Sequence, residues 1–255
     1  MFKKFAITAV LALVAACGAP SGTSVGPMII GDSDPVRFSG KQPTTFAVRG
    51  MDAARFQKSV DWVRAKAVGI EFVFLKATEG GDLKDIKFRD HWRGAGRAGV
   101  ARGAYHFYYF CTDPATQARF FIQNVPRTKG SLPPVLDMEW NPFSPTCKRR
   151  PDGATVRAEM KVWMDIVEAH YGQRPIIYTT PRFYKENGLS AIKREEFWLR
   201  TTAKTPREAF PGQPWRFWQY TATGTLPGTP GAVDINAFNG SAEDWAAWRA
   251  RRSVQ

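Results

Sequence analysis

Residues 71–110 read EFVFLKATEGGDLKDIKFRDHWRGAGRAGVARGAYHFYYF. The stretch begins with an apolar run at residues 71–77 and ends with a second one at residues 103–110. Both runs are typical of buried strands, and residues 88–98 between them predict a helix that Gly99 ends. Strands that alternate with helices in this way form βα units, in which the strands lie parallel. The stretch therefore predicts an α/β fold.

The same alternation continues on both sides of this stretch. Helices are also predicted over residues 61–69, 113–124 and 155–171, and a capping box at Ser241 opens a C-terminal helix. The predicted strands cover residues 46–52, 71–77, 103–110, 135–140, 175–179, 197–199, 216–220 and 233–238. About eight strands with repeated βα units predict an irregular β/α barrel, with fewer helices in its last third. No boundary or internal repeat divides residues 46–255, so we expect one domain there.

The composition suits several kinds of globular protein. The 9 Trp, 18 Phe and 7 Tyr residues fit a large core, and they equally fit a sugar cleft, because flat rings suit the apolar faces of pyranoses. The formal charge of +13 suits nucleic acid, anionic lipid or an acidic polymer. No nucleic-acid-binding motif is present, so we expect no nucleic-acid partner. The positive residues are scattered, apart from short groups such as Lys148-Arg149-Arg150.

The N-terminus has the features of an export signal. Lys3 and Lys4 precede an apolar run at residues 5–16, which is too short to span a bilayer. The run leads into Val14-Ala15-Ala16-Cys17, which resembles the lipobox of bacterial lipoproteins. We therefore expect residues 1–16 to be a signal peptide and Cys17 to be acylated. The alternative is an ordinary secretory signal with a chance cysteine.

The signal implies an exported lipoprotein that its N-terminal lipid holds on a membrane facing the cell wall. Gly18 differs from the Asp that commonly retains lipoproteins in the inner membrane, so an outer-membrane or periplasmic location is expected if the cell has an outer membrane. Residues 17–45 are rich in Gly, Pro, Ser and Thr. We interpret them as the lipidated cysteine and a flexible tether to the domain at residues 46–255.

Export also bears on the two remaining cysteines. With Cys17 acylated, Cys111 and Cys147 form an even pair in an oxidising compartment, which favours a disulfide. Each follows a predicted strand of the barrel, and those strands are expected to be neighbours, so both loops leave the same rim. The alternative is two buried, unpaired thiols.

The chain lacks the signatures of most other catalytic sites. His91, His106 and His170 do not have the spacing of a zinc helix, and no serine elbow, phosphate-binding loop or cysteine nucleophile signature is present. We therefore expect no metal and no cofactor. The carboxylates remain, and Asp137 and Glu139 stand out because they lie in an otherwise apolar strand.

Side chains two residues apart on a strand share a face. Buried together, Asp137 and Glu139 would push their pKa values apart, as an acid–base pair requires. The alternative is that both acids face solvent or cap loops. Asp52 ends the first predicted strand and Asp234 lies in the last, and these strands are neighbours in a closed barrel. Four carboxylates would then meet at one mouth, where barrel enzymes have their active sites.

Several motifs resemble the glycoside hydrolase family 25 lysozymes, the Chalaropsis-type muramidases, from about residue 49 to residue 241. The matching segments are Gly50-Met51-Asp52 with Gln57 and Asp61-Trp62, residues 72–80, residues 103–107, residues 132–139, residues 175–179, residues 218–221 and residues 233–240. The resemblance implies an irregular β/α barrel that cleaves the β-1,4 bond between N-acetylmuramic acid and N-acetylglucosamine in peptidoglycan glycan strands. It also implies a monomer without cofactors.

The resemblance assigns roles to individual residues. Glu139 falls on the general acid of the family, and the other acidic cleft positions are Asp52, Asp137 and Asp234. The positions that line the sugar site are Lys76, Tyr105 and Tyr178, for which barrel packing is the alternative. The resemblance further suggests retention of configuration, with the N-acetyl group of the substrate as nucleophile and Asp137 orienting it.

Two segments depart from the family pattern. Ala53-Ala54 follows Asp52 where a hydrophobic residue and Ser are usual, and Leu199-Arg200-Thr201 stands where Leu-Ala and an aromatic residue are common. Neither departure removes an acid, but both bear on substrate preference. Two other functions stay open at this point: a catalytically weak lipoprotein that binds the cell wall, and a hydrolase of another N-acetylated polysaccharide such as chitin.

Overall fold

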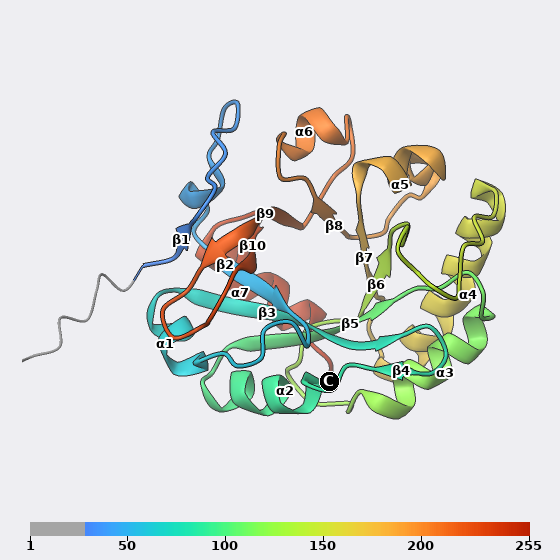
Figure 1. Ribbon diagram of the computed structural model, residues 1–255, viewed down its shortest axis with the longest axis horizontal. Helices are drawn as coiled ribbons and strands as arrows, with labels where there is room; N and C mark the ends of the chain where they lie inside the picture. The colour runs from blue at the N-terminus through green and yellow to red at the C-terminus, as the bar shows by residue number, and fades with distance from the viewer. Residues whose placement is uncertain (1–28) are drawn as a thin grey trace, which may run out of the picture.

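The computed structural model describes residues 29–255, so the predicted signal peptide and Cys17 lie outside the described residues. Eight strands form a closed barrel (Figure 1). They are β2 (Arg49–Ala53), β3 (Ile70–Glu79), β5 (Ala101–Phe107), β6 (Val135–Met138), β7 (Ile176–Thr179), β8 (Phe197–Arg200), β9 (Phe217–Thr225) and β10 (Val233–Phe238). Two short strands, β1 (Gly31–Asp32) and β4 (Leu83–Lys84), pair with β9 and β3. The predicted irregular β/α barrel is confirmed.

The helices surround this barrel. They are α1 (Trp62–Ala67), α2 (Phe88–Arg97), α3 (Pro114–Asn124), α4 (Gly153–Tyr171), α5 (Pro181–Glu186), α6 (Pro206–Ala209) and α7 (Ala242–Arg252), with 3-10 turns η1 (Pro43–Thr45) and η2 (Leu189–Ala191). The sequence analysis missed α5 and α6, because helices of six and four residues are too short to show an apolar period. Within residues 29–255, no helix combines the length and apolarity that a bilayer crossing requires.

The last strand runs against the others. All neighbouring pairs among the other seven barrel strands are parallel. β10 lies antiparallel between β9 and β2 and closes the barrel. A parallel crossover needs about a dozen residues or more, and only residues 226–232 join β9 to β10. Gly228 and Gly231 in this connection adopt positive φ angles of 76° and 80°, which other residues rarely tolerate. The short connection therefore forces a hairpin.

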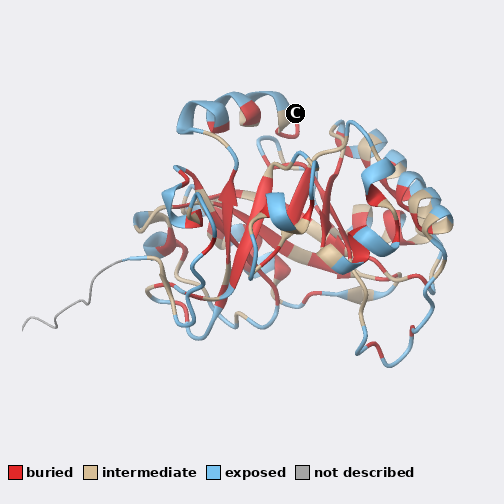
Figure 2. Cartoon of the chain, turned by 90° about the horizontal axis from the view of Figure 1, so that it is seen from above, coloured by how far each residue is buried: buried red, intermediate tan, exposed pale blue. Residues whose placement is uncertain are grey.

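Two apolar layers hold the barrel together. Inside it, Phe72, Phe74 and Phe217 are completely buried, and α7 closes the bottom with Trp245 and Trp248. The Trp248 ring lies 5.2 Å from Phe217, measured between ring centroids. Outside it, the helices cover the strands, so that buried strands occupy the centre of Figure 2 and exposed helix faces its periphery. The inner layer fills the lower barrel and leaves its upper mouth to polar side chains.

The folded part begins earlier than the sequence predicted. We predicted a flexible tether up to residue 45, but β1 pairs with β9 and Phe38 is buried. The Phe38 ring lies 4.9 Å from Trp218, and Phe46 packs against the same indole. Burial of these aromatic rings holds the segment from Gly31 onward against the barrel.

A disulfide joins Cys111 and Cys147 in the structure, with their Cα atoms 5.7 Å apart. Cys111 follows β5 and Cys147 follows β6, and these two strands are paired in the sheet. The bond therefore ties together two neighbouring loops at the mouth of the barrel. In the chain-entropy model, closing a loop of 36 residues stabilises the fold by about 3–4 kcal/mol.

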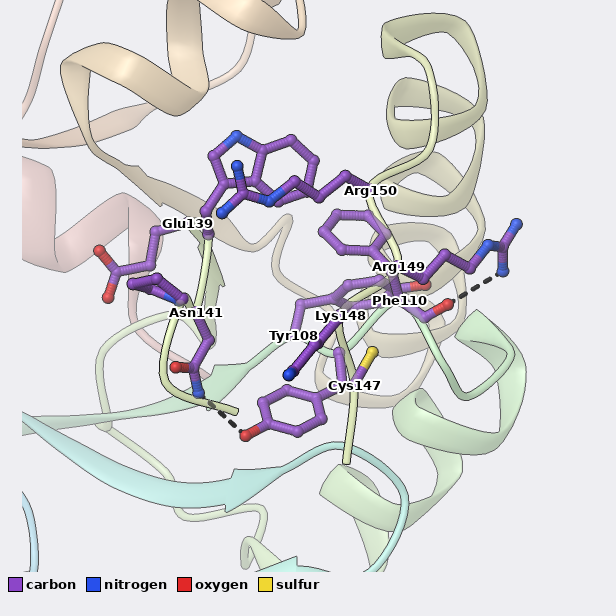
Figure 3. Close-up of a pocket in the computed structure, with 11 residues that line it drawn as sticks. Tyr108, Phe110, Glu139, Asn141, Cys147, Lys148, Arg149 and Arg150 are labelled. Atoms are coloured by element: carbon purple, nitrogen blue, oxygen red, sulfur yellow. Dashed lines mark hydrogen bonds between the residues drawn. The ribbon is translucent and has the colours of Figure 1, made fainter. Parts of the chain in front are cut away.

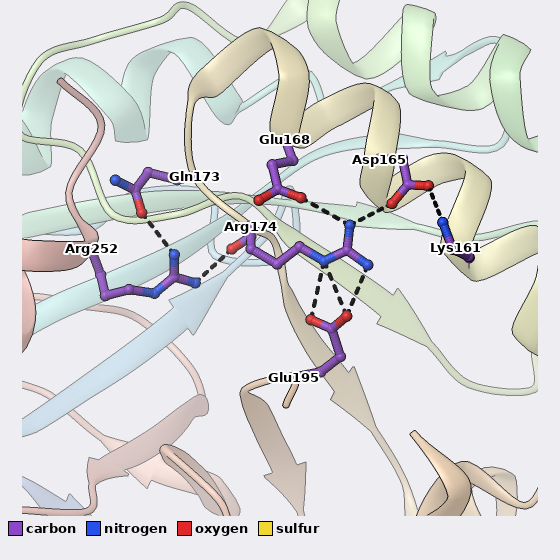
Figure 4. Close-up of polar contacts among 7 residues, drawn as sticks. All are labelled: Lys161, Asp165, Glu168, Gln173, Arg174, Glu195 and Arg252. Atoms are coloured by element: carbon purple, nitrogen blue, oxygen red, sulfur yellow. Dashed lines mark hydrogen bonds and ion pairs between the residues drawn. The ribbon is translucent and has the colours of Figure 1, made fainter. Parts of the chain in front are cut away.

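Arg174 organises an ion-pair network at the opposite end of the barrel (Figure 4). Its guanidinium contacts Asp165 and Glu168 of α4. It also forms a bidentate ion pair with Glu195, which precedes β8. Arg252 at the end of α7 donates to the Arg174 carbonyl oxygen over 2.6 Å. The Arg174 side chain thus links α4 to the chain entering β8, and its backbone carbonyl binds the C-terminal helix.

We expect Arg174→Ala to lower the free energy of unfolding by about 1–3 kcal/mol, because three carboxylates lose a partly buried partner. Urea denaturation with the disulfide intact measures this change. Arg182→Ala is the matched control, since among residues 29–255 Arg182 pairs only with Glu186 on the exposed face of α5, and its loss should change stability by less than about 0.5 kcal/mol. Equal effects of the two substitutions would contradict a structural role for the network.

Candidate active site

The seven residues that the sequence analysis assigned to the site all line one pocket at the mouth of the barrel, which we call the acid pocket. Six elements contribute them. The residues are Asp52 on β2, Lys76 on β3, Tyr105 on β5, Asp137 on β6, Glu139 directly after β6, Tyr178 on β7 and Asp234 on β10.

The register of the barrel explains why the acids meet. β10 pairs with β2 so that Asp234 lies directly opposite Asp52. Asp137 lies between Phe107 of β5 and Tyr178 of β7. Asp234 reaches the mouth from the amino end of its strand, and not from a carboxyl end as the other acids do, because β10 is antiparallel.

Asp52 is buried and receives hydrogen bonds from two neighbouring strands. Gln219 Nε2 on β9 and Asn236 Nδ2 on β10 each donate to Asp52 Oδ2 over 2.8 Å. Trp198 Nε1 donates to Asn236 Oδ1 over 2.7 Å, and because an indole can only donate, the Asn236 NH2 group must face Asp52. Burial and the neighbouring Asp234 raise the pKa of Asp52 well above its usual range, and the two amides oppose this rise.

Asp137 has no comparable partners. Its Oδ1 atom is buried and accepts no hydrogen bond from residues 29–255. Burial raises the pKa of Asp137 well above its usual range; Glu139 adds to the rise and Lys76 opposes it. A buried oxygen without a donor is unfavourable. No donor within residues 29–255 therefore stabilises the ionised form of Asp137 at this oxygen.

Glu139 is half-buried where the chain leaves β6. Burial raises the pKa of Glu139, while Arg200 and Lys76 oppose the rise. Burial also raises the pKa of Asp234 to about 6, again against Arg200. A carboxyl group with a raised pKa retains its proton closer to neutral pH, as a general acid must.

The sequence analysis assigned no role to Glu79, which holds Lys76 in place. The Lys76 ammonium group forms an ion pair with Glu79 and lies 4.8 Å from the centre of the Phe107 ring. The Glu79 carboxyl also receives a hydrogen bond from Tyr109, and together with Lys76 this lowers its pKa against the effect of burial. Glu79 belongs to the segment 72–80 that matches the family, and that match was the available signal.

Arg200 is a second residue of the site that the sequence analysis assigned no role. It ends β8, lines the acid pocket and is half-buried. Within residues 29–255 its guanidinium forms no ion pair and no side-chain hydrogen bond, although it lies close enough to lower the pKa values of Glu139 and Asp234. Ala53 and Ala54 line the same pocket. Both departures from the family pattern therefore lie in the site.

A groove extends the acid pocket along the mouth of the barrel. The two share Phe56, Lys76 and Phe107, and the groove continues to Phe143 in the loop after β6. Phe56 and Phe143 are 73% and 91% exposed, although aromatic side chains of this size are usually buried. Exposed rings along a polar groove are suited to stack on sugar rings.

The histidines of the domain take no part in this pocket. His106 is completely buried, where Nε2 contacts Gln117 Oε1 over 3.0 Å and Nδ1 contacts Thr78 Oγ1 over 2.8 Å. Burial lowers the pKa of His106 to about 4, so it stays neutral. Among residues 29–255, no group of three or more His, Cys, Asp or Glu side chains is arranged to hold a metal ion.

Comparison with known proteins places the chain in a family. The sequence pattern of glycosyl hydrolases family 25 matches residues 51–229. Lysozyme M1 of Streptomyces globisporus is 36% identical over 214 residues, which cover 78% of this chain and 70% of that protein. An N,O-diacetylmuramidase of Chalaropsis is 33% identical over 144 residues, or 54% of this chain and 68% of that protein.

A solved structure is also similar to this chain. The family 25 glycosyl hydrolase from Bacillus anthracis superimposes with a TM-score of 0.73 at 33% identity, covering 79% of this chain and 93% of that one. The matched residues 51–229 include the strands that carry Asp52 and Asp137. The two structures share the barrel. The chain therefore belongs to glycosyl hydrolases family 25.

Proposed function

We propose that the protein is a peptidoglycan hydrolase that acts as an N-acetylmuramidase, with Glu139 as its general acid. The observation that carries this proposal is the convergence of four carboxyl groups in one pocket of a family 25 barrel. Relatives named lysozyme and N,O-diacetylmuramidase support the same activity. The target is the β-1,4 bond that follows N-acetylmuramic acid in the glycan strand.

The chemistry begins with proton transfer from Glu139 to the glycosidic oxygen. As the bond to the leaving sugar breaks, the remaining sugar gains oxocarbenium-like positive charge. The raised pKa of Glu139 favours its protonated form up to a higher pH than for an ordinary glutamate, and Glu139 lines the acid pocket. Asp234, whose pKa burial raises to about 6, is a source of negative charge in the same pocket when it is ionised.

Asp137 is the proposed partner of the substrate N-acetyl group. The N–H of that group can donate to the Asp137 carboxyl group, which lines the acid pocket and whose buried Oδ1 has no donor within residues 29–255. Such a donor stabilises the ionised carboxylate and lowers the pKa of Asp137, which burial otherwise raises. Substrate binding would thus produce the charged form that orients the N-acetyl group and offsets its developing positive charge.

Lys76, Tyr105 and Tyr178 are the proposed sugar contacts. Burial raises the pKa values of both tyrosines well above their usual range, so the hydroxyl groups stay protonated. Tyr178 donates to Gln219 Oε1 over 2.9 Å, and Gln219 in turn bonds to Asp52. Tyr178 therefore also supports the position of Asp52.

We expect Glu139→Gln to lower the rate of peptidoglycan hydrolysis by about 10²–10⁴-fold, because glutamine has no proton to transfer. Clearing of purified peptidoglycan and release of reducing ends measure the rate. Glu243→Gln is the matched control, since Glu243 is exposed on α7 at the bottom of the barrel, and it should hydrolyse at the wild-type rate.

The reducing-end sugar of the products shows which glycosidic bond the wild-type protein cleaves. Reduction of the new ends with borohydride should yield muramitol, because a muramidase leaves N-acetylmuramic acid at the reducing end. Glucosaminitol instead, or faster release from chitin than from peptidoglycan, would overturn the proposed bond. A folded Glu139→Gln protein with near wild-type turnover would overturn the proposed acid.

Arg200→Gln should move the alkaline limb of the pH profile of kcat/KM to higher pH. The guanidinium holds down the pKa of Glu139, so its removal raises that pKa, and a general acid works only while it is protonated. Activity would then persist to a higher pH than in the wild type. Arg97→Gln on the exposed end of α2 removes the same charge far from the pocket and should leave the limb in place. A limb that stays or moves to lower pH would contradict the assignment.

We further propose that Cys17 carries lipid and holds the barrel on a membrane that faces the wall. The lipobox-like segment before Cys17 supports this, and the family supports action in the periplasm or outside the cell. Removal of residues 1–16 takes away two lysines and no acid, which leaves a formal charge of 13 − 2 = +11. Several acyl chains on one cysteine would give stable attachment.

Mass spectrometry of the protein isolated from membranes tests this proposal. We expect the N-terminal peptide to begin at Cys17 and to carry acyl chains, and we expect Cys17→Ser to release the protein from the membrane fraction. A free Cys17 thiol, or cleavage at another residue, would rule out the lipid anchor.

A further inference from the structure

A second pocket adjoins the acid pocket at Glu139 (Figure 3). It is lined by three consecutive cations, Lys148, Arg149 and Arg150, and by Trp140 and Asn141. We call it the cationic pocket. Its charge is opposite to that of the acid pocket, and Glu139 lines both. A substrate bound at Glu139 can therefore reach both.

Two of the three cations are available to a ligand. Arg149 is committed to the fold, because it donates to the Phe110 carbonyl oxygen over 2.9 Å and pairs with Glu159 at 3.7 Å. Lys148 and Arg150 form no ion pair within residues 29–255, and both are exposed. Unpaired cations that face one pocket are suited to bind an anion.

Arg150 is also held in a defined position. Its guanidinium lies 5.2 Å from the centre of the Trp140 ring. The Trp140 indole N–H donates in turn to Glu186 of α5 over 2.6 Å. A guanidinium that stacks on an aromatic face still has its N–H groups, which lie in the guanidinium plane, free to bind a carboxylate.

The walls of the cationic pocket are fixed before any ligand binds. The disulfide anchors Cys147, next to Lys148, to the loop after β5. Buried Gln117 donates to the Tyr109 and Thr112 carbonyl oxygens of that loop, each over 2.7 Å. Across the pocket, Asn141 Nδ2 donates to the Tyr109 hydroxyl over 3.0 Å (Figure 3). A preorganised site loses less entropy on binding than a mobile loop would.

We infer that the cationic pocket binds a carboxylate carried by an N-acetylmuramic acid residue next to the cleaved bond. This inference rests on the proposed function and names the part of the substrate that the pocket recognises. N-acetylmuramic acid differs from N-acetylglucosamine by a lactyl ether that ends in a carboxyl group. That group is either free or joined to a stem peptide, which has carboxylates of its own.

The pairing of the two pockets orients the glycan strand. Lys148 and Arg150 attract an anionic group, so it favours the side of Glu139 where these cations lie. A strand bound in the reverse direction, or shifted by one sugar, places the carboxylate away from the cations. The cationic pocket therefore selects the sugar that stands at the cleavage point.

Binding to the full-length Glu139→Gln protein tests the inference without turnover. Calorimetry would measure the affinities of three tetrasaccharides: a glycan with free lactyl groups, the same glycan with stem peptides, and chitotetraose, which has no lactyl group. Adding Lys148→Gln and Arg150→Gln together should weaken binding of one or both lactyl-bearing ligands by about 10-fold. The affinity for chitotetraose should not change.

The control carries Lys129→Gln and Arg97→Gln instead. These exposed residues lie away from the barrel mouth, and their removal changes the net charge equally. Loss of affinity for the free lactyl glycan identifies the lactyl carboxylate as the ligand, and loss for the peptide-bearing glycan alone identifies the stem peptide.

Three results would overturn the assignment while the proposed function stands: unchanged affinity for both lactyl-bearing glycans, an equal loss with the control pair, or an equal loss of chitotetraose binding. An equal loss of chitotetraose binding would show that the pocket binds sugar rings and not a carboxylate. Failure of the parent Glu139→Gln protein to bind any lactyl-bearing glycan would overturn the proposed function together with the inference.

Discussion

The insertion of β10 between β9 and β2 is the constraint on which the rest of the structure depends. Without this strand the barrel would be left with two open edges and unpaired backbone groups. The strand also brings polar groups to the mouth, because its reversed direction sets Asp234 opposite Asp52 and points Asn236 at the Asp52 carboxyl. The strand that closes the barrel thus also forms one wall of the site.

Burial affects the acids of the site in different ways, according to the partners each has. Asp52 is satisfied by two amides from the protein, whereas Asp137 keeps one oxygen without a partner among the described residues. Glu139 is less buried, and Arg200 and Lys76 oppose the rise that burial causes in its pKa. Burial raises the pKa values of all three acids, so they differ in their partners: two amides at Asp52, no donor to Asp137 Oδ1 among residues 29–255, and two cations near Glu139.

The loops after β5 and β6 add a second level of organisation. The disulfide and the Gln117 hydrogen bonds hold them as a fixed rim, so cations at residues 148–150 stay beside the acids without collapsing onto them. Opposite charges that are kept apart in this way can act on different parts of one substrate. At the other end of the barrel, Arg174 and α7 stabilise the fold without access to the groove.

The sequence by itself determined the barrel and the identity of its acids, because apolar periodicity is local and Asp137 and Glu139 are conspicuous in an apolar strand. The expected closure of the barrel extended this to Asp52 and Asp234, and the family motifs added Lys76, Tyr105 and Tyr178. Only the tertiary structure decided the direction of β10, the partners of Asp52, the position of Arg200 and the pocket of Lys148 and Arg150. These depend on strand register and barrel closure, which bring together side chains that are far apart in the chain, and no local pattern records which of them will meet.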